Sequence, residues 1–428
     1  MADYTDRIIN HADGIGIKEA LDRIADAVGT QSKNPVRYGI RIDKNDGNAD
    51  SRVTYIFDAV GMTPAKMDYA NGRFDYGSWA DAWFVKNNYP AFYSLEGKEE
   101  YKLDSNDQTK KIDGSASGIA DASVKGNFFS VFDGSNGNKI YLCQEETATG
   151  YEYIIVSNYK WSDKYVDDAY VREDGSHADK LLYPMFKGSI VDGKLRSIAG
   201  QNPTANTSAQ EEISYAAANS DKAKYRIGDW AHYNLIWSLL KIMGKSENLQ
   251  SVFGNGDMST YDGSNTTTYG KVDTGTLKDK GQFFGYNDGA HDVKCFYIEG
   301  LWADRWERLL GFIQKNGRAL IKMTPPYNLT GDGYTDAGAV SSNEGWAKGS
   351  TCNRYGRWTT TVGASDSTFL CDYYYVNTSV TAVLLVGGDC DNGSHCGAYL
   401  FLYGAAGSRD WIIGASLFLE PLVGGAGA

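Results

Sequence analysis

The stretch of sequence on which the fold prediction depends is GGDCDNGSHCGAYLFLYGAAGSRDWIIGASLFL, residues 387–419. Small and apolar residues alternate in it with polar and aromatic side chains that share no common chemistry. Residues 399–403 alternate strictly between aromatic and leucine side chains. A strand there would point Leu400 and Leu402 to one face of a sheet and three aromatic rings to the other. With the leucines in the core, the stretch predicts a contact surface carried by a rigid frame.

The composition of the whole chain limits the class of protein. A length of 428 residues predicts about two or three domains, and 49 Gly against 8 Pro indicates many turns and β-structure. The formal net charge of -12 argues against nucleic-acid binding, which needs a basic face. No apolar run approaches membrane-spanning length, so no membrane insertion is expected. The N-terminus has no basic region followed by an apolar one, which predicts synthesis in the cytoplasm without a signal peptide.

The first 182 residues divide into a helical segment and a β-rich region. Apolar residues at three- and four-residue spacing predict that residues 1–35 form a helical docking or oligomerisation segment. Runs at 36–42, 52–57, 128–132, 139–143 and 151–159, separated by turn sequences, predict a β-rich domain over 36–182. The polar residues 99–127 are expected to form an exposed loop, and the aromatic-rich residues 71–90 to pack in the core.

The remaining residues, 183–428, mix helix and strand signals. Apolar periodicity predicts helices at 213–219 and 230–243, and short apolar runs predict strands at 293–298 and 320–324. Residues 328–350 are expected to be loop, followed by short strands and turns over 352–419. The predicted fold class is therefore α+β, with a β-rich domain ahead of a mixed C-terminal domain.

No catalytic or metal-binding motif stands out. The five histidines are isolated, and the sequence has no serine-centred G-x-S-x-G elbow and no zinc-protease, phosphate-loop or dinucleotide pattern. The calcium-loop-like Asp389-x-Asp391-x-Gly393 has Leu400 where a bidentate Glu should stand. The six cysteines lack the spacing of a disulfide framework, which predicts free thiols in a reducing compartment. The sequence therefore predicts no enzyme activity, no cofactor and no metal site.

The C-terminal residues carry a family resemblance. The pattern reads Gly387-Gly388-x-Cys390-x-Asn392-Gly393-Ser394, then Gly397-Ala398-x-Leu400-x-Leu402, then Trp411-x-Ile413-Gly414-Ala415-x-Leu417. It resembles the variable region of the target proteins of diversity-generating retroelements, which display that region on a C-type lectin fold of the formylglycine-generating-enzyme type. The upstream Trp302-Ala-Asp-Arg-Trp306-Glu and the helix at 230–243 fit the same domain. The resemblance covers roughly residues 183–428, and the N-terminal half resembles phage structural proteins.

The resemblance implies a ligand-binding surface whose side chains are replaceable. In that family a reverse transcriptase copies a template with errors at adenines, so that exposed positions vary while the frame is kept. The variable region here would span about 352–419. Its ligand-binding residues would be Tyr373, Tyr374, Tyr375, Asn377, Cys390, Asp391, His395, Tyr399, Phe401, Tyr403, Ser408, Arg409 and Asp410.

The resemblance also implies partners and a location. Phage members of the family bind a receptor on the host cell, which is a protein or a glycan, and they do so as multimers. We therefore expect a homo-oligomer, with a trimer favoured, located at a phage tail tip or fibre. Its N-terminal region would contact other tail proteins.

Two alternative functions stay open at this stage. One is a copper oxidase of the formylglycine-generating type that uses Cys390 and Cys396, and the other is a carbohydrate-binding lectin that needs no calcium. The first depends on fold-level analogy with the enzyme that gives the fold its name.

Overall fold

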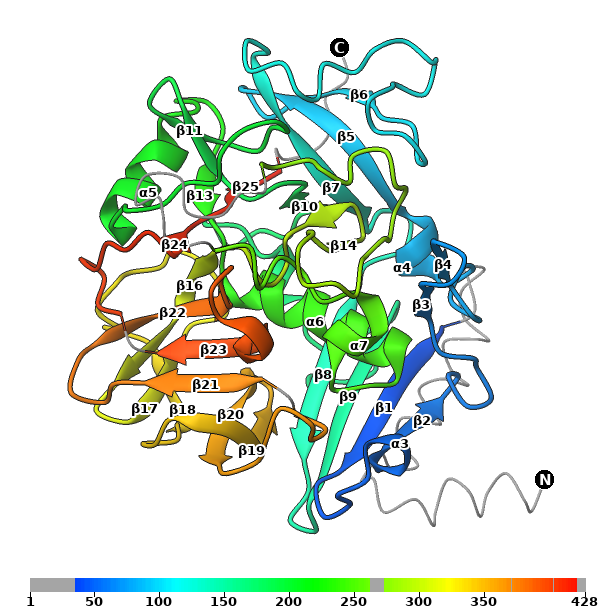
Figure 1. Ribbon diagram of the computed structural model, residues 1–428, viewed down its shortest axis with the longest axis vertical. Coiled ribbons are helices and arrows are strands. Elements are labelled where there is room, and N and C mark those ends of the chain that lie inside the picture. Colours follow the sequence, from blue (N-terminus) through cyan, green and yellow to red (C-terminus); the bar gives the residue numbers. More distant parts are fainter. Residues whose placement is uncertain (1–34, 262–272, 371, 403, 422–428) are drawn as a thin grey trace.

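The computed structural model describes residues 35–261, 273–370, 372–402 and 404–421 (Figure 1). Apart from Pro35, the predicted N-terminal docking helix lies outside these residues. The described chain is a mixed fold in which small, mostly antiparallel sheets dominate and helices are few, which confirms the α+β class. Within the described ranges no helix is long and apolar enough to cross a membrane.

Two four-stranded antiparallel sheets form the N-terminal half. The first has the order β2-β1-β9-β8, with β1 (Arg37–Asp43), β2 (Val53–Phe57), β8 (Tyr141–Glu146) and β9 (Tyr151–Ser157). The second has the order β10-β7-β5-β6, with β5 (Asn88–Ser94), β6 (Glu99–Lys102), β7 (Gly126–Asp133) and β10 (Lys180–Pro184). The predicted strands are confirmed, and β10 crosses the predicted domain boundary at residue 182.

The expected exposed loop over 99–127 is only partly right. Its first residues form β6, which pairs with β5, and the side chains of Gln108 and Ser117 are buried. Gln108 accepts a hydrogen bond from the buried ammonium of Lys294, so this polar segment contributes to the interior. The expected exposure was based on polar composition. Composition does not show that these polar side chains have hydrogen-bond partners in the interior, so the prediction was partly wrong.

A central helix, α6 (Trp230–Gly244), lies between the first sheet and the C-terminal sheet (Figure 1). It contacts β1 and β9 on one side and β16 on the other, and all of its residues are buried. The Asp229 side chain caps its N-terminus by accepting a hydrogen bond from the His232 backbone N–H. The predicted helix at 230–243 is therefore confirmed. Its residues are buried around the whole circumference because both sides of the helix are covered, and the buried polar Asn234 and Ser238 hydrogen-bond with Gln144 of β8.

The C-terminal half is built around a nine-stranded sheet that carries the residues of interest. Eight strands follow the order β18-β17-β16-β22-β23-β21-β19-β20, and β24 pairs with β16 in parallel. They are β16 (Trp306–Lys315), β17 (Arg318–Ile321), β18 (Thr335–Ala339), β19 (Gly345–Asn353), β20 (Gly356–Val362), β21 (Tyr373–Val376), β22 (Ala382–Gly387), β23 (Gly397–Leu402) and β24 (Ile413–Gly414).

The expected loop over 328–350 is wrong, because β18 and the start of β19 lie within it. Strand β18 is at the outer edge of the nine-stranded sheet, where half-exposed Gly, Ala and Asp residues are tolerated. The predicted strand at 293–298 is instead a tight hairpin of β14 (Lys294–Cys295) and β15 (Ile298–Glu299), because Phe296 and Tyr297 have positive φ.

Short elements complete the described chain. The helices are α3 (Ala49–Arg52), α4 (Trp83–Lys86), α5 (Ala209–Ala217), α7 (Leu249–Phe253) and the 3-10 turns η1 (Asp168–Tyr170) and η2 (Gly393–His395). The strand pairs are β3 (Lys66–Asp68) with β4 (Arg73–Asp75), β11 (Ser189–Val191) with β12 (Lys194–Arg196), and β13 (Tyr225–Ile227) with β25 (Leu417–Leu419). The last pairing places β25 beside β13, the strand that precedes α6.

One large hydrophobic core joins the two halves. It extends from Ile40 on β1 through α6 to Leu402 on β23 and Phe418 on β25. The aromatic-rich residues 71–90 contribute Trp79 to this core, as predicted. Buried residues of the C-terminal sheet therefore share one hydrophobic core with residues of the N-terminal sheets.

Candidate functional site

Strand β21 divides its side chains between the core and the outer face of the nine-stranded sheet. Tyr374 and Val376 are buried, whereas Tyr373 and Tyr375 are half-buried on the opposite face. This is the period-two alternation of a strand with one face covered. Tyr373 and Tyr375 thus remain available for contacts from outside the sheet.

Four rings from three segments meet at this face, and we call Trp346, Tyr373, Tyr375 and His395 the aromatic cluster. The Tyr373 ring stacks on the His395 imidazole with centroids 4.2 Å apart and planes 12° apart. The Trp346 ring on β19 meets the same imidazole edge-on, at 4.9 Å and 89°. The Tyr375 hydroxyl lies 2.6 Å from His395 Nδ1. All four side chains are half-buried, so the cluster is compact and partly exposed.

The protonation states of the cluster follow from its partial burial. Burial lowers the pKa of His395 from its ordinary 6.5, although Asp366 acts in the opposite direction. Burial and the nearby Asp389 carboxylate raise the pKa of Tyr375. At neutral pH the imidazole is therefore neutral and the phenol protonated, so we infer that the Tyr375 O–H donates to Nδ1. The proton of the imidazole is then on Nε2.

The loop that carries His395 is held by close backbone packing. Gly388 has a φ of +88°, and a Cβ there would lie 2.6 Å from the Cys396 Sγ. The backbone N–H of Cys390 donates to the Asp304 carbonyl at 3.1 Å, and that of Ala303 donates to the Gly387 carbonyl at 2.9 Å. Gly387 also has a positive φ, of +101°, so the backbone conformation favours glycine at both positions.

Two predicted surface residues are in fact buried. Tyr374 is 0% exposed, and its hydroxyl donates to the Ser341 carbonyl at 3.1 Å. Cys390 is also 0% exposed, and its sulfur lies 3.9 Å from the Arg305 guanidinium beneath the loop. The prediction that they belong to a contact surface is wrong. Tyr374 alternates to the core face of β21, and the 387–396 loop folds over Cys390.

The other predicted site residues lie outside the aromatic cluster as defined here or are only partly described. Ser408, Arg409 and Asp410 follow the C-terminal end of β23, whereas His395 precedes its N-terminal end (Figure 1). Arg409 is exposed and forms an ion pair of 3.0 Å with Glu211. Asn377 follows β21 and is half-buried, and Asp391 is exposed on the 387–396 loop.

The strand predicted over 399–403 is confirmed as β23. The Phe401 backbone pairs with Tyr375 on one side and Leu385 on the other. Leu402 is buried, as the alternation predicted. The Tyr399 and Phe401 side chains and the whole of Tyr403 lie outside the described residues.

Trp346 is a site residue that the sequence did not reveal. It stands in a run of small residues, GWAKGS, that was expected to be loop. Its only sequence signal is a lone large ring between small neighbours. Its place beside His395 depends on the pairing of β19 with β21, in which Trp346 is opposite Tyr373.

The two cysteines of the oxidase alternative are both buried. Burial raises the pKa of Cys390 to about 12, with a further contribution from Asp304, and it raises that of Cys396 well above its ordinary value. The Cys396 thiol donates to the Asp389 carbonyl at 3.1 Å. Both thiols are therefore protonated at neutral pH, and this geometry favours a structural role. The described cysteines, 143, 295, 352, 390 and 396, are all free.

Four buried carboxyl groups lie in or near the 387–396 loop: Asp389 in the loop itself, and Asp257, Asp292 and Asp304 on other segments. An oxygen of Asp257, Asp292 and Asp389 has no hydrogen-bond partner in the described structure. Burial, the largest cause, raises the pKa of Asp257 to about 6 and that of Asp389 to about 7. The described ranges bring no three His, Cys, Asp or Glu side chains into a metal-binding arrangement.

These carboxyl groups predict a stability that falls as pH rises. Between the ordinary value of 3.8 and pH 7 the folded state holds protons on Asp389 that the unfolded chain releases. The free energy of unfolding therefore decreases with increasing pH in this window, by up to about 1.4 kcal/mol for each unit of pKa shift. Urea unfolding at pH 5, 6, 7 and 8 measures it, and Asp389→Asn should flatten the dependence. A wild-type stability that is constant or rises from pH 5 to 8 would contradict this expectation.

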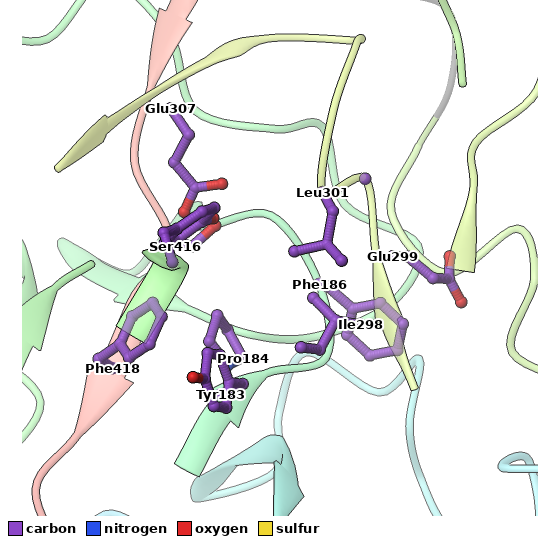
Figure 2. A pocket seen from close by; sticks show the side chains of 11 residues that line it. Tyr183, Pro184, Phe186, Ile298, Glu299, Leu301, Glu307, Ser416 and Phe418 are labelled. Carbon is purple, nitrogen blue, oxygen red and sulfur yellow. The ribbon is translucent and has the colours of Figure 1, made fainter. Parts of the chain in front are cut away.

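The pocket in Figure 2 lies inside the protein, away from the aromatic cluster. Tyr183, Phe186, Leu301 and Phe418 supply its apolar wall, and Glu299 and Glu307 are at its margins. The free space admits no water-sized molecule. We regard it as a packing gap between the sheets, not a ligand site.

A scan against models of known protein families finds no match to this chain, and a search of characterised proteins finds none either.

Proposed function

We propose that this protein is a non-enzymatic receptor-binding protein whose ligand surface is centred on the aromatic cluster. The observation that carries the proposal is the division along β21 and the 387–396 loop. Tyr373, Tyr375 and His395 are partly exposed, while Tyr374, Cys390 and Cys396 beside them are buried. Side chains on the open face can therefore be exchanged without disturbing the core.

The chemistry of the open face supports a binding role. Tyrosine and histidine combine a large ring with a polar tip. Because they have few rotatable bonds, they lose little conformational entropy when a ligand binds. A rigid scaffold with variable side chains on it is how binding loops are generally built. Arg409, Ser408 and Asp391 would extend the surface at other points of the 387–412 segment.

The proposal includes the finer assignments that the resemblance implies. Residues 183–428 would form a C-type lectin-like domain of a diversity-generating retroelement target protein. The pairing of β13 with β25 places residues 417–419 beside the segment that leads into α6, which supports assigning both to one C-terminal domain. The protein would act at a phage tail tip or fibre as a homo-oligomer, with a trimer favoured, in which several weak sites add up. The N-terminal residues would attach it to other tail proteins.

Cell binding tests the proposal. Labelled protein is titrated onto a panel of bacterial strains, and we expect saturable binding to at least one. Tyr373→Ser and His395→Ala should each weaken it by about 2 kcal/mol, roughly 30-fold, as residues at the centre of an interface do. Tyr151→Ser on β9, a half-buried tyrosine of the N-terminal sheet, is the matched control and should bind as wild type does.

Two results would overturn the proposal. One is that the wild-type protein binds no strain in the panel. The other is that the Tyr373 and His395 variants, folded as judged by their melting temperatures, bind as tightly as the control.

A further inference from the structure

Three polar atoms of the aromatic cluster have no hydrogen-bond partner among the described residues. They are the Trp346 indole N–H, the Tyr373 hydroxyl and the His395 Nε2; the structure gives none of them a hydrogen bond to any described residue. By contrast, the Tyr375 hydroxyl is engaged with His395 Nδ1. The cluster thus combines apolar ring surface with two hydrogen-bond donors and a hydroxyl that both donates and accepts.

The charges around the cluster argue against an anionic ligand. The cluster has no positive group, because burial lowers the pKa of His395. The exposed charged residues on the adjoining segments are Glu344, Asp366, Asp391 and Lys348, three acidic and one basic. The whole chain carries a formal charge of -12. An anionic ligand, such as a phosphorylated or carboxylated polymer, would meet net repulsion.

The ring geometry also argues against a cation held between the rings. Tyr373 and His395 are stacked face to face at 4.2 Å, and Trp346 contacts both of them edge-on. A cage for an ammonium group needs ring faces that surround an open space. Here the rings fill that space themselves, so a ligand meets a platform.

We propose that the aromatic cluster binds a neutral saccharide of the cell surface. A pyranose presents C–H groups on its faces and hydroxyl groups around its edge. Such a ring matches an aromatic platform bordered by Trp346 N–H, Tyr373 O–H and His395 Nε2–H, and the exposed Asp366 and Asp391 carboxylates are further acceptors for sugar hydroxyls. The inference depends on the proposed receptor-binding function and narrows its ligand from any receptor to a neutral glycan.

The test compares treated cells of a strain that binds the protein. Mild periodate, which cleaves vicinal diols, should reduce binding at least tenfold, whereas protease treatment should leave it unchanged. Neutral polysaccharide extracted from the same cells should compete, and raising NaCl from 50 to 500 mM should change the affinity less than twofold. Tyr373→Phe, which removes only the hydroxyl, should weaken binding to the isolated polysaccharide several-fold, and Tyr373→Ser should weaken it further.

The possible failures are distinguishable. If protease treatment abolishes binding and periodate leaves it unchanged, the receptor is a protein. That result overturns the saccharide proposal but leaves the proposed receptor-binding function in place. A steep loss of affinity with salt means a charged ligand and overturns the neutral saccharide alone. Equal cell binding by Tyr373→Ser and the Tyr151→Ser control overturns both proposals.

Discussion

Replacing Leu402 by Asp is expected to abolish folding of the C-terminal sheet. Leu402 is 0% exposed on β23, which lies between β22 and β21, and it belongs to the large core. An unpaired carboxylate there would cost several kcal/mol in lost apolar contact and desolvation. That is comparable to the whole stability of a typical domain, about 5–15 kcal/mol. Circular dichroism melts should show no cooperative transition, or one lowered by tens of degrees.

The matched change is Tyr373→Ser on the neighbouring strand. Tyr373 is half-buried on the outer face of the sheet, and its ring contacts are with other members of the aromatic cluster. Its removal should lower the melting temperature by only a few degrees, since about 1 kcal/mol of surface packing is lost. If Leu402→Asp and Tyr373→Ser were equally destabilising, the division into a buried frame and an exposed binding face would be wrong.

Arg308→Met is the second change with a large expected effect. Arg308 is fully buried on β16 and forms an ion pair of 2.7 Å with Glu212 of α5, which is also fully buried. Its guanidinium also donates to the Ser408 carbonyl at 3.1 Å, so it ties the segment after β23 to the sheet. Removing the cation leaves a buried carboxylate alone, which typically costs about 3–5 kcal/mol. Urea unfolding at pH 8, where Glu212 gains least from protonation, measures the loss.

The double variant Arg308→Met with Glu212→Leu supplies the control. Since neither charge then remains, its stability should exceed that of Arg308→Met alone. If the double variant were less stable than Arg308→Met, the ion pair between Arg308 and Glu212 would not be the interaction that holds α5 against β16.

The elements with strong local patterns were predictable from the sequence. Apolar periodicity over 230–243 predicted α6, and the alternation at 399–403 predicted β23. The aromatic cluster was predictable in part. Tyr373, Tyr375 and His395 were among the ligand-binding residues that the family resemblance implies, and the structure brings these three together.

What could not be predicted depends on pairing between distant segments. Nothing local marks Trp346 as a site residue, because its position depends on β19 lying beside β21. The burial of Cys390 requires the 302–305 segment to cover it from below. The raised pKa of Asp389 has the same origin, since an Asp in a Gly-rich loop gives no indication of burial. The alternation of residues along a strand predicts which side chains share a face. Tertiary packing decides which of the two faces is buried.

The most direct test of the central claim is to sequence many sibling copies of this coding region. The proposal predicts that substitutions gather within residues 372–412 at the exposed and half-exposed positions, such as Tyr373, Tyr375, His395 and Arg409. It also predicts that the buried Tyr374, Cys390 and Leu402 remain unchanged in every copy. Substitutions spread evenly along the chain, or as frequent at these three buried residues as at the exposed ones, would contradict a replaceable surface on a fixed frame.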